Sequence, residues 1–216
     1  MLQLHHTPST AAMVPHILLE EIGVPYERVP VDRAGGAHKS PAYLRLNPNG
    51  LIPVLVDGDL VLYETAAIAL HLCDQHPAAE LAPAVGTAER AHFYKWMAWL
   101  TNTLQATLIV YFYPERWVDA GNAEAMAQVR RHAHERAVGL LGQLEEQVRS
   151  HAGPWFFGER YTALDPYVLT LCRWTRNFPS GRARDLPRLG PYLQRVLERP
   201  AVQRVLANEQ LQPPFV

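Results

Sequence analysis

The sequence predicts a small α/β domain followed by a larger all-helical domain. Short runs of β-type residues and one hairpin signal occur only before residue 64, where they alternate with helical periodicity. Residues 77–86 are rich in proline, alanine and glycine, which suits a linker. Beyond them, apolar residues recur at three- and four-residue spacing without a convincing strand pattern. We therefore divide the chain into residues 1–79 and 86–216.

The strands of the first domain are indicated by β-type runs and by turn residues. Residues 2–6 and 27–31 are typical of short strands, and residues 54–62 are typical of two strands joined at Asp57-Gly58. An Asp-Gly pair between such runs is a strong hairpin signal. Helical stretches separate the strands, which makes this part of the chain α/β.

The start of the first helix is constrained by a proline. Apolar residues lie on one face of this helix, and Gly23 marks its end. Pro15 has no N–H, so it is tolerated only in a first turn, where that N–H would have no intrahelical partner. The helix therefore begins little earlier than Ala11 or Ala12. Ser9 and Thr10 are predicted to lie just before its N-terminus.

The second domain contains the features of a helical bundle. A capping box of Thr162 and Asp165 precedes one helix, and we interpret that box as a folding element. Apolar residues at helical spacing predict helices over residues 87–112, 122–150, 163–178 and 190–207.

Composition excludes several classes of partner. The formal net charge is −1, and charged residues make up 19% of the chain without a long run of one sign. The basic field that nucleic acid or anionic lipid would need is therefore missing. The N-terminus lacks a basic region with a long apolar run, and no stretch approaches the roughly 18 apolar residues of a membrane span. We expect a cytoplasmic protein with no nucleic-acid or membrane partner.

Cysteine and histidine usage points away from disulfides and metals. Cys73 and Cys172 lie far apart and form no CxxC motif, so we expect both to be reduced and buried. The ten histidines show no HExxH spacing, and we expect no metal site.

The stretch NPNGLIPVL, residues 47–55, predicts a turn that leads into a strand at Pro53. A cis bond before Pro53 would leave the N–H and C=O of Ile52 as an open edge. An extended peptide could pair with that edge as an added strand. The alternative is an ordinary turn with a trans proline, which general frequencies favour.

Glu64 and Thr65 open an apolar-periodic helix directly after the hairpin. Residues of these types commonly cap the free N–H groups of a helix. The alternative is ligand binding, with Glu64 receiving an ammonium group while Thr65 and the helix N-terminus receive a carboxylate.

Together, in this order and spacing, these motifs resemble those of the soluble glutathione transferases over nearly the whole chain. The resemblance rests on a β-α-β portion with NPNGLIPVL, a hairpin, ET opening a helix, a linker, and a helical domain with TALD. It implies that residues 1–79 form a thioredoxin-like domain that binds glutathione as a co-substrate, and that residues 86–216 contribute the electrophile pocket. It also implies a cis bond before Pro53, a homodimer and a role in detoxification.

Within that resemblance, several residues take the family's roles toward glutathione. The cysteinyl backbone pairs with the residue before the cis proline, here Ile52 before Pro53. The γ-glutamyl end meets the acidic residue and the hydroxyl that open the third helix, here Glu64 and Thr65, where many relatives have serine in place of threonine.

The segment HKSPAYLRLNP resembles the plant phi class, in which a histidine or lysine meets the glycyl carboxylate. By that resemblance His38 and Lys39 take this role, although a solvated loop charge is an equally good interpretation. The phi-class glutamine before the Ile-Pro pair is Leu51 here, so one polar contact is missing.

The corner before the first helix would then hold the glutathione sulfur. Ser9 matches the serine of the phi, theta and zeta classes, and we expect its hydroxyl to stabilise the thiolate, with Thr10 in reserve. Ala11 falls on the cysteine of the bacterial beta class, although AMVPHILL resembles the SLSPHIAL pattern of that class. The alternative is that Ser9 and Thr10 only cap the helix.

The electrophile should lie over the sulfur, against the helical domain. Gln105 falls near a beta-class histidine that faces the second substrate. Aromatic residues at helical spacing are also typical of a core. The candidates for this wall are Trp99, Gln105, Tyr111, Phe112 and Tyr113.

The resemblance thus predicts a glutathione transferase in which a bound thiolate attacks a small hydrophobic electrophile. A glutathione-dependent isomerase, dehalogenase or peroxidase would use the same thiolate, although the zeta-class Ser-Ser-Cys motif is Ser9-Thr10-Ala11 here. The remaining alternative is a non-enzymatic binding or scaffold protein on this fold. Retained Glu64 and Thr65 argue against a scaffold, which has no need of a γ-glutamyl site.

Overall fold

A four-stranded sheet in the order β2-β1-β3-β4 organises the first part of the chain in the computed structural model, which describes all 216 residues. β1 (Leu2–His6) pairs in parallel with β2 (Tyr26–Pro30) and antiparallel with β3 (Val54–Asp57). β3 and β4 (Leu60–Tyr63) form the predicted hairpin. The predicted second strand is confirmed with its bounds shifted by one residue.

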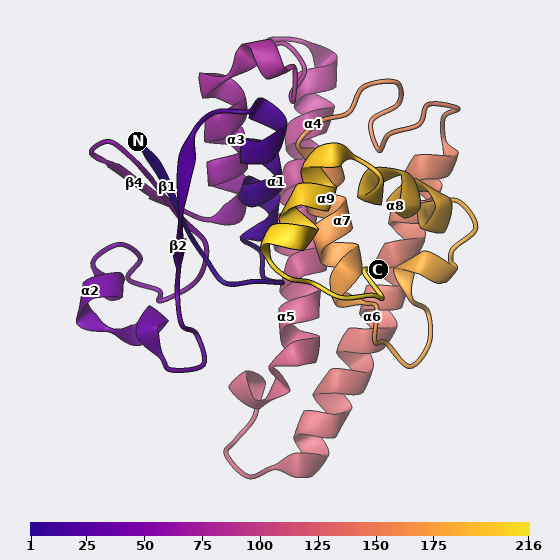
Figure 1. Cartoon of the computed structure of the whole chain (residues 1–216). Coiled ribbons are helices and arrows are strands. Elements are labelled where there is room, and N and C mark those ends of the chain that lie inside the picture. The colour runs from indigo at the N-terminus through magenta and orange to yellow at the C-terminus, as the bar shows by residue number, and fades with distance from the viewer.

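Two helices lie between this sheet and the rest of the molecule (Figure 1). They are α1 (Met13–Ile22) and α3 (Thr65–Gln75), whereas the short α2 (Pro41–Leu44) lies on the opposite side of the sheet. A 3-10 turn, η1 (Ala37–Lys39), precedes α2. This is the thioredoxin-like arrangement.

Proline and glycine set the bounds of α1 as the sequence predicted. Pro15 is the third residue of the helix, and Ala12 is its N-cap. Gly23 ends the helix with φ +77°, in the left-handed region that a residue without a Cβ adopts at no steric cost.

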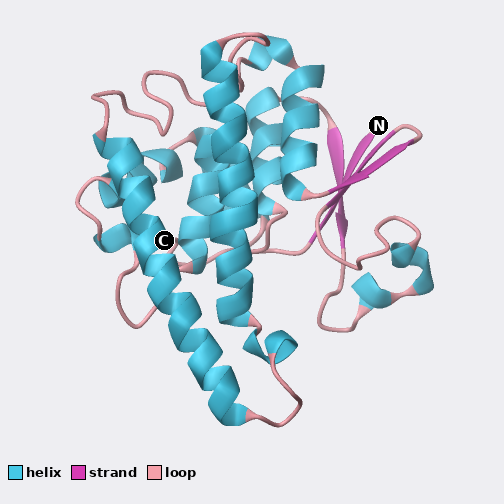
Figure 2. Cartoon of the chain, turned by 180° about the vertical axis from the view of Figure 1, so that it is seen from behind, coloured by secondary structure: helices cyan, strands magenta, loops and turns pink.

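The remainder of the chain is helical (Figure 2). The predicted helix over residues 87–112 is continuous but contains a π-helical segment, η3, between α4 and α5. The elements are η2 (Pro77–Ala79), α4 (Ala88–Trp99), η3 (Leu100–Gln105), α5 (Ala106–Phe112), η4 (Pro114–Trp117), α6 (Ala123–Arg149), α7 (Leu164–Trp174), η5 (Ala183–Asp185), α8 (Leu189–Leu197) and α9 (Pro200–Asn208).

One predicted helix is wrong as a single element. Residues 190–207 form α8 and α9, because Pro200 lacks the N–H that a continuous helix would require. Arg199, the residue before it, is extended with ψ 135°, as steric clash with a following proline favours. The helix predicted over residues 163–178 ends at Trp174.

Asp165 ties the start of α7 to its surroundings. Its fully buried carboxylate accepts hydrogen bonds from the Phe156 N–H at 2.9 Å, the Thr162 N–H at 2.8 Å and the Tyr192 hydroxyl at 2.9 Å. Burial raises the pKa of Asp165 to about 6, against these donors. The predicted capping box is half realised, because the Thr162 hydroxyl accepts from the Leu164 N–H instead of the Asp165 N–H.

The hydrophobic core runs through both parts of the chain without a break. One cluster of 42 buried residues includes Leu4 of β1, Ile17 of α1, Leu104 of η3 and Val205 of α9. No helix has the length and apolar character needed to cross a membrane. The two cysteines are free and buried, and burial raises the pKa of the Cys73 thiol to about 12.

Candidate active site

A cavity of about 410 Å³ opens where the sheet portion meets the helical portion. Both parts of the chain contribute to its wall, and many of the wall residues are ones that the sequence singled out. Those are Ser9, Thr10, His38, Lys39, Ile52, Gln105, Phe112 and Tyr113. The wall also contains Ala11, Arg33, Gly50, Leu51, Ile109, Arg116, Trp174, Arg176 and Asn177.

Five predicted site residues do not line this cavity: Pro53, Glu64, Thr65, Trp99 and Tyr111. Trp99 packs edge-on against Trp96, and the Tyr111 ring lies tilted against Phe178 with 4.6 Å between ring centroids. Both of these aromatic residues pack against the core, as their helical spacing also allowed.

Ser9 and Thr10 differ sharply in what their hydroxyls do. The Thr10 hydroxyl donates to the Thr7 carbonyl at 2.7 Å and accepts from the Ala12 N–H at 3.3 Å. Its proton is therefore committed to the loop before α1. Ser9 lines the cavity, and its hydroxyl makes no hydrogen bond within the chain. Of the two, only Ser9 is free to donate to a ligand.

The Ser9 backbone is held in an unusual conformation. Its φ is +62°, in the left-handed region where a residue with a Cβ is uncommon. Its N–H donates to Oε2 of Glu209 at 2.8 Å. Glu209 follows α9, so a residue near the C-terminus holds the loop before α1 in place.

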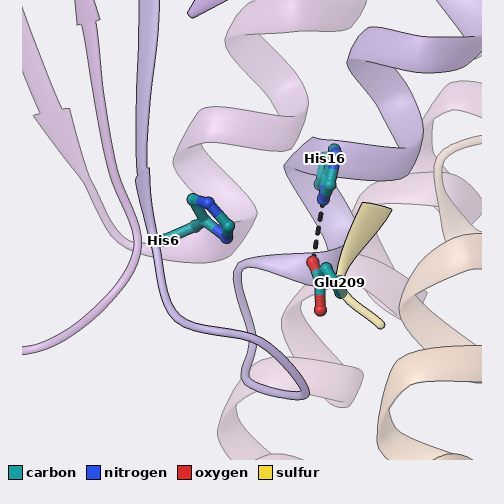
Figure 3. Close-up of side chains that lie close together, drawn as sticks. All are labelled: His6, His16 and Glu209. Carbon is teal, nitrogen blue, oxygen red and sulfur yellow. Dashed lines mark hydrogen bonds and ion pairs between the residues drawn. The ribbon is translucent and has the colours of Figure 1, made fainter. Parts of the chain in front are cut away.

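The same Glu209 carboxylate meets a buried histidine, as Figure 3 shows. Its Oε1 lies 2.8 Å from Nδ1 of His16 in α1, and both side chains are fully buried. Each carboxylate oxygen thus has one partner near the start of α1. No sequence pattern indicates this contact, because its partners are 193 and 200 residues apart.

His6, at the end of β1, lies beside this pair, with ring centroids 5.8 Å from His16. Burial lowers the pKa of His6, while the negative charge of Glu209 opposes that shift. Potential metal-ligand atoms of His6, His16 and Glu209 lie within 4.8 Å of one another. In this structure the two Glu209 carboxylate oxygens are hydrogen-bonded to the Ser9 N–H and to Nδ1 of His16.

The NPNG turn leaves Ile52 open, as the family resemblance implied. The Ile52-Pro53 bond is cis. The Leu51 carbonyl accepts from the Tyr43 hydroxyl and from Nδ2 of Asn47, each at 2.9 Å, which anchors the turn. Neither the N–H nor the C=O of Ile52 makes a hydrogen bond within the chain. An extended ligand backbone can therefore pair there.

Gly50 lets the loop before α2 approach this turn. Its φ is +59°, and an added Cβ would lie 2.7 Å from Nζ of Lys39 and 2.8 Å from the His38 carbonyl oxygen. Nζ of Lys39 donates to the Asn49 carbonyl at 3.0 Å. Burial, followed by the charges of Lys39 and Arg33, lowers the pKa of His38.

Glu64 and Thr65 stand at the N-terminus of α3, and neither caps the helix through its side chain. Glu64 has φ +73°, which makes it the second predicted site residue in the left-handed region. Tyr63 pairs with Val54, so the two residues that extend the hairpin beyond this pair are Glu64 and Pro53. The register thus places the start of α3 beside the turn that presents Ile52.

The helical wall of the cavity begins at the π-helical segment. Oε1 of Gln105 accepts from the Tyr167 hydroxyl at 2.6 Å, which leaves its amide N–H groups available. Ile109 lies one helical turn further on, and Phe112 follows at the next turn. Ile109 was not among the predicted site residues, although its helical spacing from Gln105 was an available signal. π-helical insertions are frequent at functional sites.

Comparison with known proteins identifies the family of this chain. The models for the glutathione S-transferase N-terminal and C-terminal domains match residues 2–74 and 110–209. The chain is 32% identical to the GST-like protein YncG of Escherichia coli over 81% of this chain and 82% of that protein. It is 30% identical to glutathione S-transferase GST-4.5 of Xanthomonas campestris over 97% of this chain and 100% of that protein.

A solved glutathione transferase homologue from Sulfitobacter, with bound glutathione, superposes with a TM-score of 0.88. It is 27% identical in sequence, and the match covers 98% of this chain and 99% of that one. The protein therefore belongs to the glutathione S-transferase family.

Proposed function

We propose that this protein is a glutathione transferase that ionises the glutathione thiol at Ser9 and transfers the sulfur to an electrophilic alkyl or aryl carbon. One observation carries the proposal: the free Ser9 hydroxyl and the unpaired backbone of Ile52 line the same cavity. The first is suited to a sulfur and the second to a peptide backbone, and glutathione offers both together.

The other expected contacts agree with how each side chain is held. Glu64 would receive the glutathione ammonium, and Thr65 with the α3 N-terminus would receive the γ-glutamyl carboxylate. Neither side chain is used for capping, which leaves both available. Lys39 and His38 would meet the glycyl carboxylate at the other end of the cavity.

Ionisation of the thiol needs only a modest free energy. A free thiol has a pKa of about 8.5, and helix N-termini with nearby donors lower it to roughly 7 or less. A shift of two pKa units corresponds to about 2.7 kcal/mol. A hydroxyl hydrogen bond to a charged group contributes about 1.5–3 kcal/mol, and the helix dipole adds to it. No general base is required, and the buried thiols of the chain take no part.

The electrophile would lie between the sulfur and the helical wall. Ile109, Phe112 and Trp174 give that wall an apolar surface, and Gln105 gives it a polar group. Conjugation of reactive compounds in such a pocket is a detoxification reaction. Transfer requires only proximity and a thiolate, since the enzyme holds both reactants in one cavity.

We also propose two domains, residues 1–79 and 86–216, and a homodimer. The edge strand β4 exposes Leu60 and Val61, whose exposed fractions are 43% and 39%. An exposed apolar sheet edge is a suitable surface for pairing with a second copy of the chain. Sedimentation velocity should give a dimer for the natural chain and a monomer for Val61→Asp. Cytoplasmic location stays a prediction.

The proposal is tested by calorimetric titration with glutathione at neutral pH, in two buffers of different ionisation enthalpy. The difference between the two heats counts the protons released on binding. We expect binding with proton release, and we expect Ser9→Ala to bind glutathione while releasing far fewer protons. Absence of binding would reject the proposed function.

A further inference from the structure

The cavity is lined by four basic side chains, three arginines and one lysine, and by no carboxylate. The cations are Arg33, Lys39, Arg116 and Arg176. None of them takes part in an ion pair anywhere in the chain. What sets the cavity apart is that four cationic side chains gather in it with no carboxylate among the residues that line it.

Arg116 and Arg176 belong to the helical wall. The Arg116 guanidinium stacks on the Tyr113 ring at 4.1 Å from its centroid. Arg176 follows α7 and is half-buried, and its Nη1 donates to the Arg173 carbonyl at 2.9 Å. Burial lowers the pKa of Arg176, so an anion beside it would offset a cost that the folded chain already bears.

In the proposed function, glutathione is bound by only one of these four cations, Lys39. Its two carboxylates and one ammonium are matched, in the proposed function, by Lys39 with His38 and by the residues that open α3. Arg116 and Arg176 come instead from the part of the wall that carries Phe112 and Trp174. That is the side on which the electrophile would lie.

We propose that the second substrate carries an anionic group, a carboxylate or a sulfonate, on an aromatic or apolar body. Arg116 and Arg176 bind the anion, while Phe112 and Trp174 pack against the body. This inference rests on the proposed function. Planar guanidinium groups pair with carboxylates through two hydrogen bonds, and they also reduce the repulsion between an anionic substrate and the thiolate.

A matched pair of electrophiles isolates the charge. They are 4-chloro-3,5-dinitrobenzoate and the neutral 4-chloro-3,5-dinitrobenzamide. With either one, the thiolate sulfur forms a bond to the ring carbon that bears chlorine, the carbon–chlorine bond breaks, and chloride leaves with its electron pair. The thiol proton goes to solvent. Each kcat/KM is divided by the uncatalysed rate constant with glutathione, which removes the difference in intrinsic reactivity.

We expect the natural chain to prefer the benzoate by about tenfold or more on this scale, and the preference to shrink as salt is added. Arg116→Gln and Arg176→Gln should each lower the benzoate-to-benzamide ratio about tenfold. Arg176→Lys should keep part of it. Arg131→Gln, an exposed arginine of α6 outside the cavity, is the control and should leave the ratio unchanged.

Equal corrected rates for the two electrophiles would overturn the inference while the proposed function stands. It would also be overturned if the arginine variants raised the KM for glutathione with both electrophiles, because the arginines would then bind glutathione.

If glutathione binds but neither electrophile reacts, the inference is tested by titrating that complex with unreactive 3,5-dinitrobenzoate and 3,5-dinitrobenzamide. Tighter binding of the benzoate, lost in Arg176→Gln, supports the inference, and equal binding rejects it. Absence of glutathione binding rejects the proposed function and this inference with it.

Discussion

Ser9 and Thr10 are adjacent residues with similar chemistry, yet their surroundings give their hydroxyls different tasks. Thr10 uses its proton and one lone pair in the loop before α1, whereas Ser9 keeps its hydroxyl free at the cavity. The left-handed backbone of Ser9 is costly for a residue with a Cβ, by about 1–3 kcal/mol. A fold keeps such a conformation where a specific contact, here the Glu209 carboxylate, compensates it.

This difference predicts different effects of removing the two hydroxyls. Ser9→Ala should raise the pKa of the bound glutathione thiol by about one to two units, because a hydrogen bond to a charged group contributes about 1.5–3 kcal/mol. Thr10→Ala should leave that pKa nearly unchanged and lower the free energy of unfolding by about 1 kcal/mol. Ultraviolet absorbance of the thiolate across a pH series measures the first, and urea unfolding measures the second. Turnover unchanged in Ser9→Ala and abolished in Thr10→Ala would assign the thiolate to Thr10.

His6 should make the stability of the protein depend on pH. Burial lowers the pKa of His6 below the value of 6.5 that the unfolded chain has, so in mildly acidic solution the unfolded state binds a proton that the folded state does not. The contribution is fully present above pH 6.5 and is lost as pH falls below that value. Urea unfolding at a series of pH values should show a shallower decline for His6→Gln. Parallel curves for the two proteins would contradict the prediction.

At the scale of elements, polar side-chain contacts join α1 and α9 at both ends. Arg199 at the start of α9 forms a two-pronged ion pair with Glu21 at the end of α1, with Nη2 and Oε2 2.7 Å apart. Glu209 at the end of α9 meets His16 and Ser9 at the start of α1. The two helices therefore run antiparallel. The C-terminal part of the chain sets the position of Ser9, which is proposed to stabilise the thiolate.

Glu209→Gln tests this fastening while preserving side-chain shape. An amide cannot accept from both partners with the strength of a carboxylate, so the free energy of unfolding should fall by about 2–3 kcal/mol. The bound thiol should ionise less readily, because Ser9 loses its anchor. Glu198→Gln, an exposed glutamate after α8, is the matched control and should change neither quantity. If the Glu209 variant lost stability but the bound thiol kept its pKa, Glu209 would contribute to folding and not to ionisation of the thiol.

At the scale of the whole molecule, one core joins the two proposed domains. The buried cluster includes residues of the sheet, of α1 and α3, and of most helices beyond them. Removing either domain would expose apolar surface that the other covers, and this favours unfolding in one cooperative step.

All five tryptophans lie in the helical part, which makes this cooperativity measurable. Tryptophan fluorescence reports that part alone, whereas hydrogen exchange of β1 and β3 amides reports the sheet. We expect both to follow one transition with denaturant at a fixed protein concentration. Sheet amides that exchange well before the fluorescence changes would show two independent units.

The sequence by itself determined the order of the elements and much of the candidate site. Asp57-Gly58 predicted the hairpin, and Pro15 with Gly23 predicted the bounds of α1, because such effects act within a few residues of the chain. The open Ile52 backbone was expected from the resemblance to the glutathione transferases, because the motif around Pro53 taken alone favours a trans proline. The break at Pro200 was also local and was missed because helical spacing continues across it.

Only the tertiary structure decided which hydroxyl is free, what holds Ser9 in place, and which charges the cavity gathers. The Glu209 contact joins residues 200 positions apart, and Arg116 and Arg176 reach one wall from two separate turns. No periodicity or spacing encodes such a meeting, because it depends on how α1, α5, α7 and α9 pack around a shared core. The direction of each side chain follows from that packing, and the chemistry of the cavity follows from those directions.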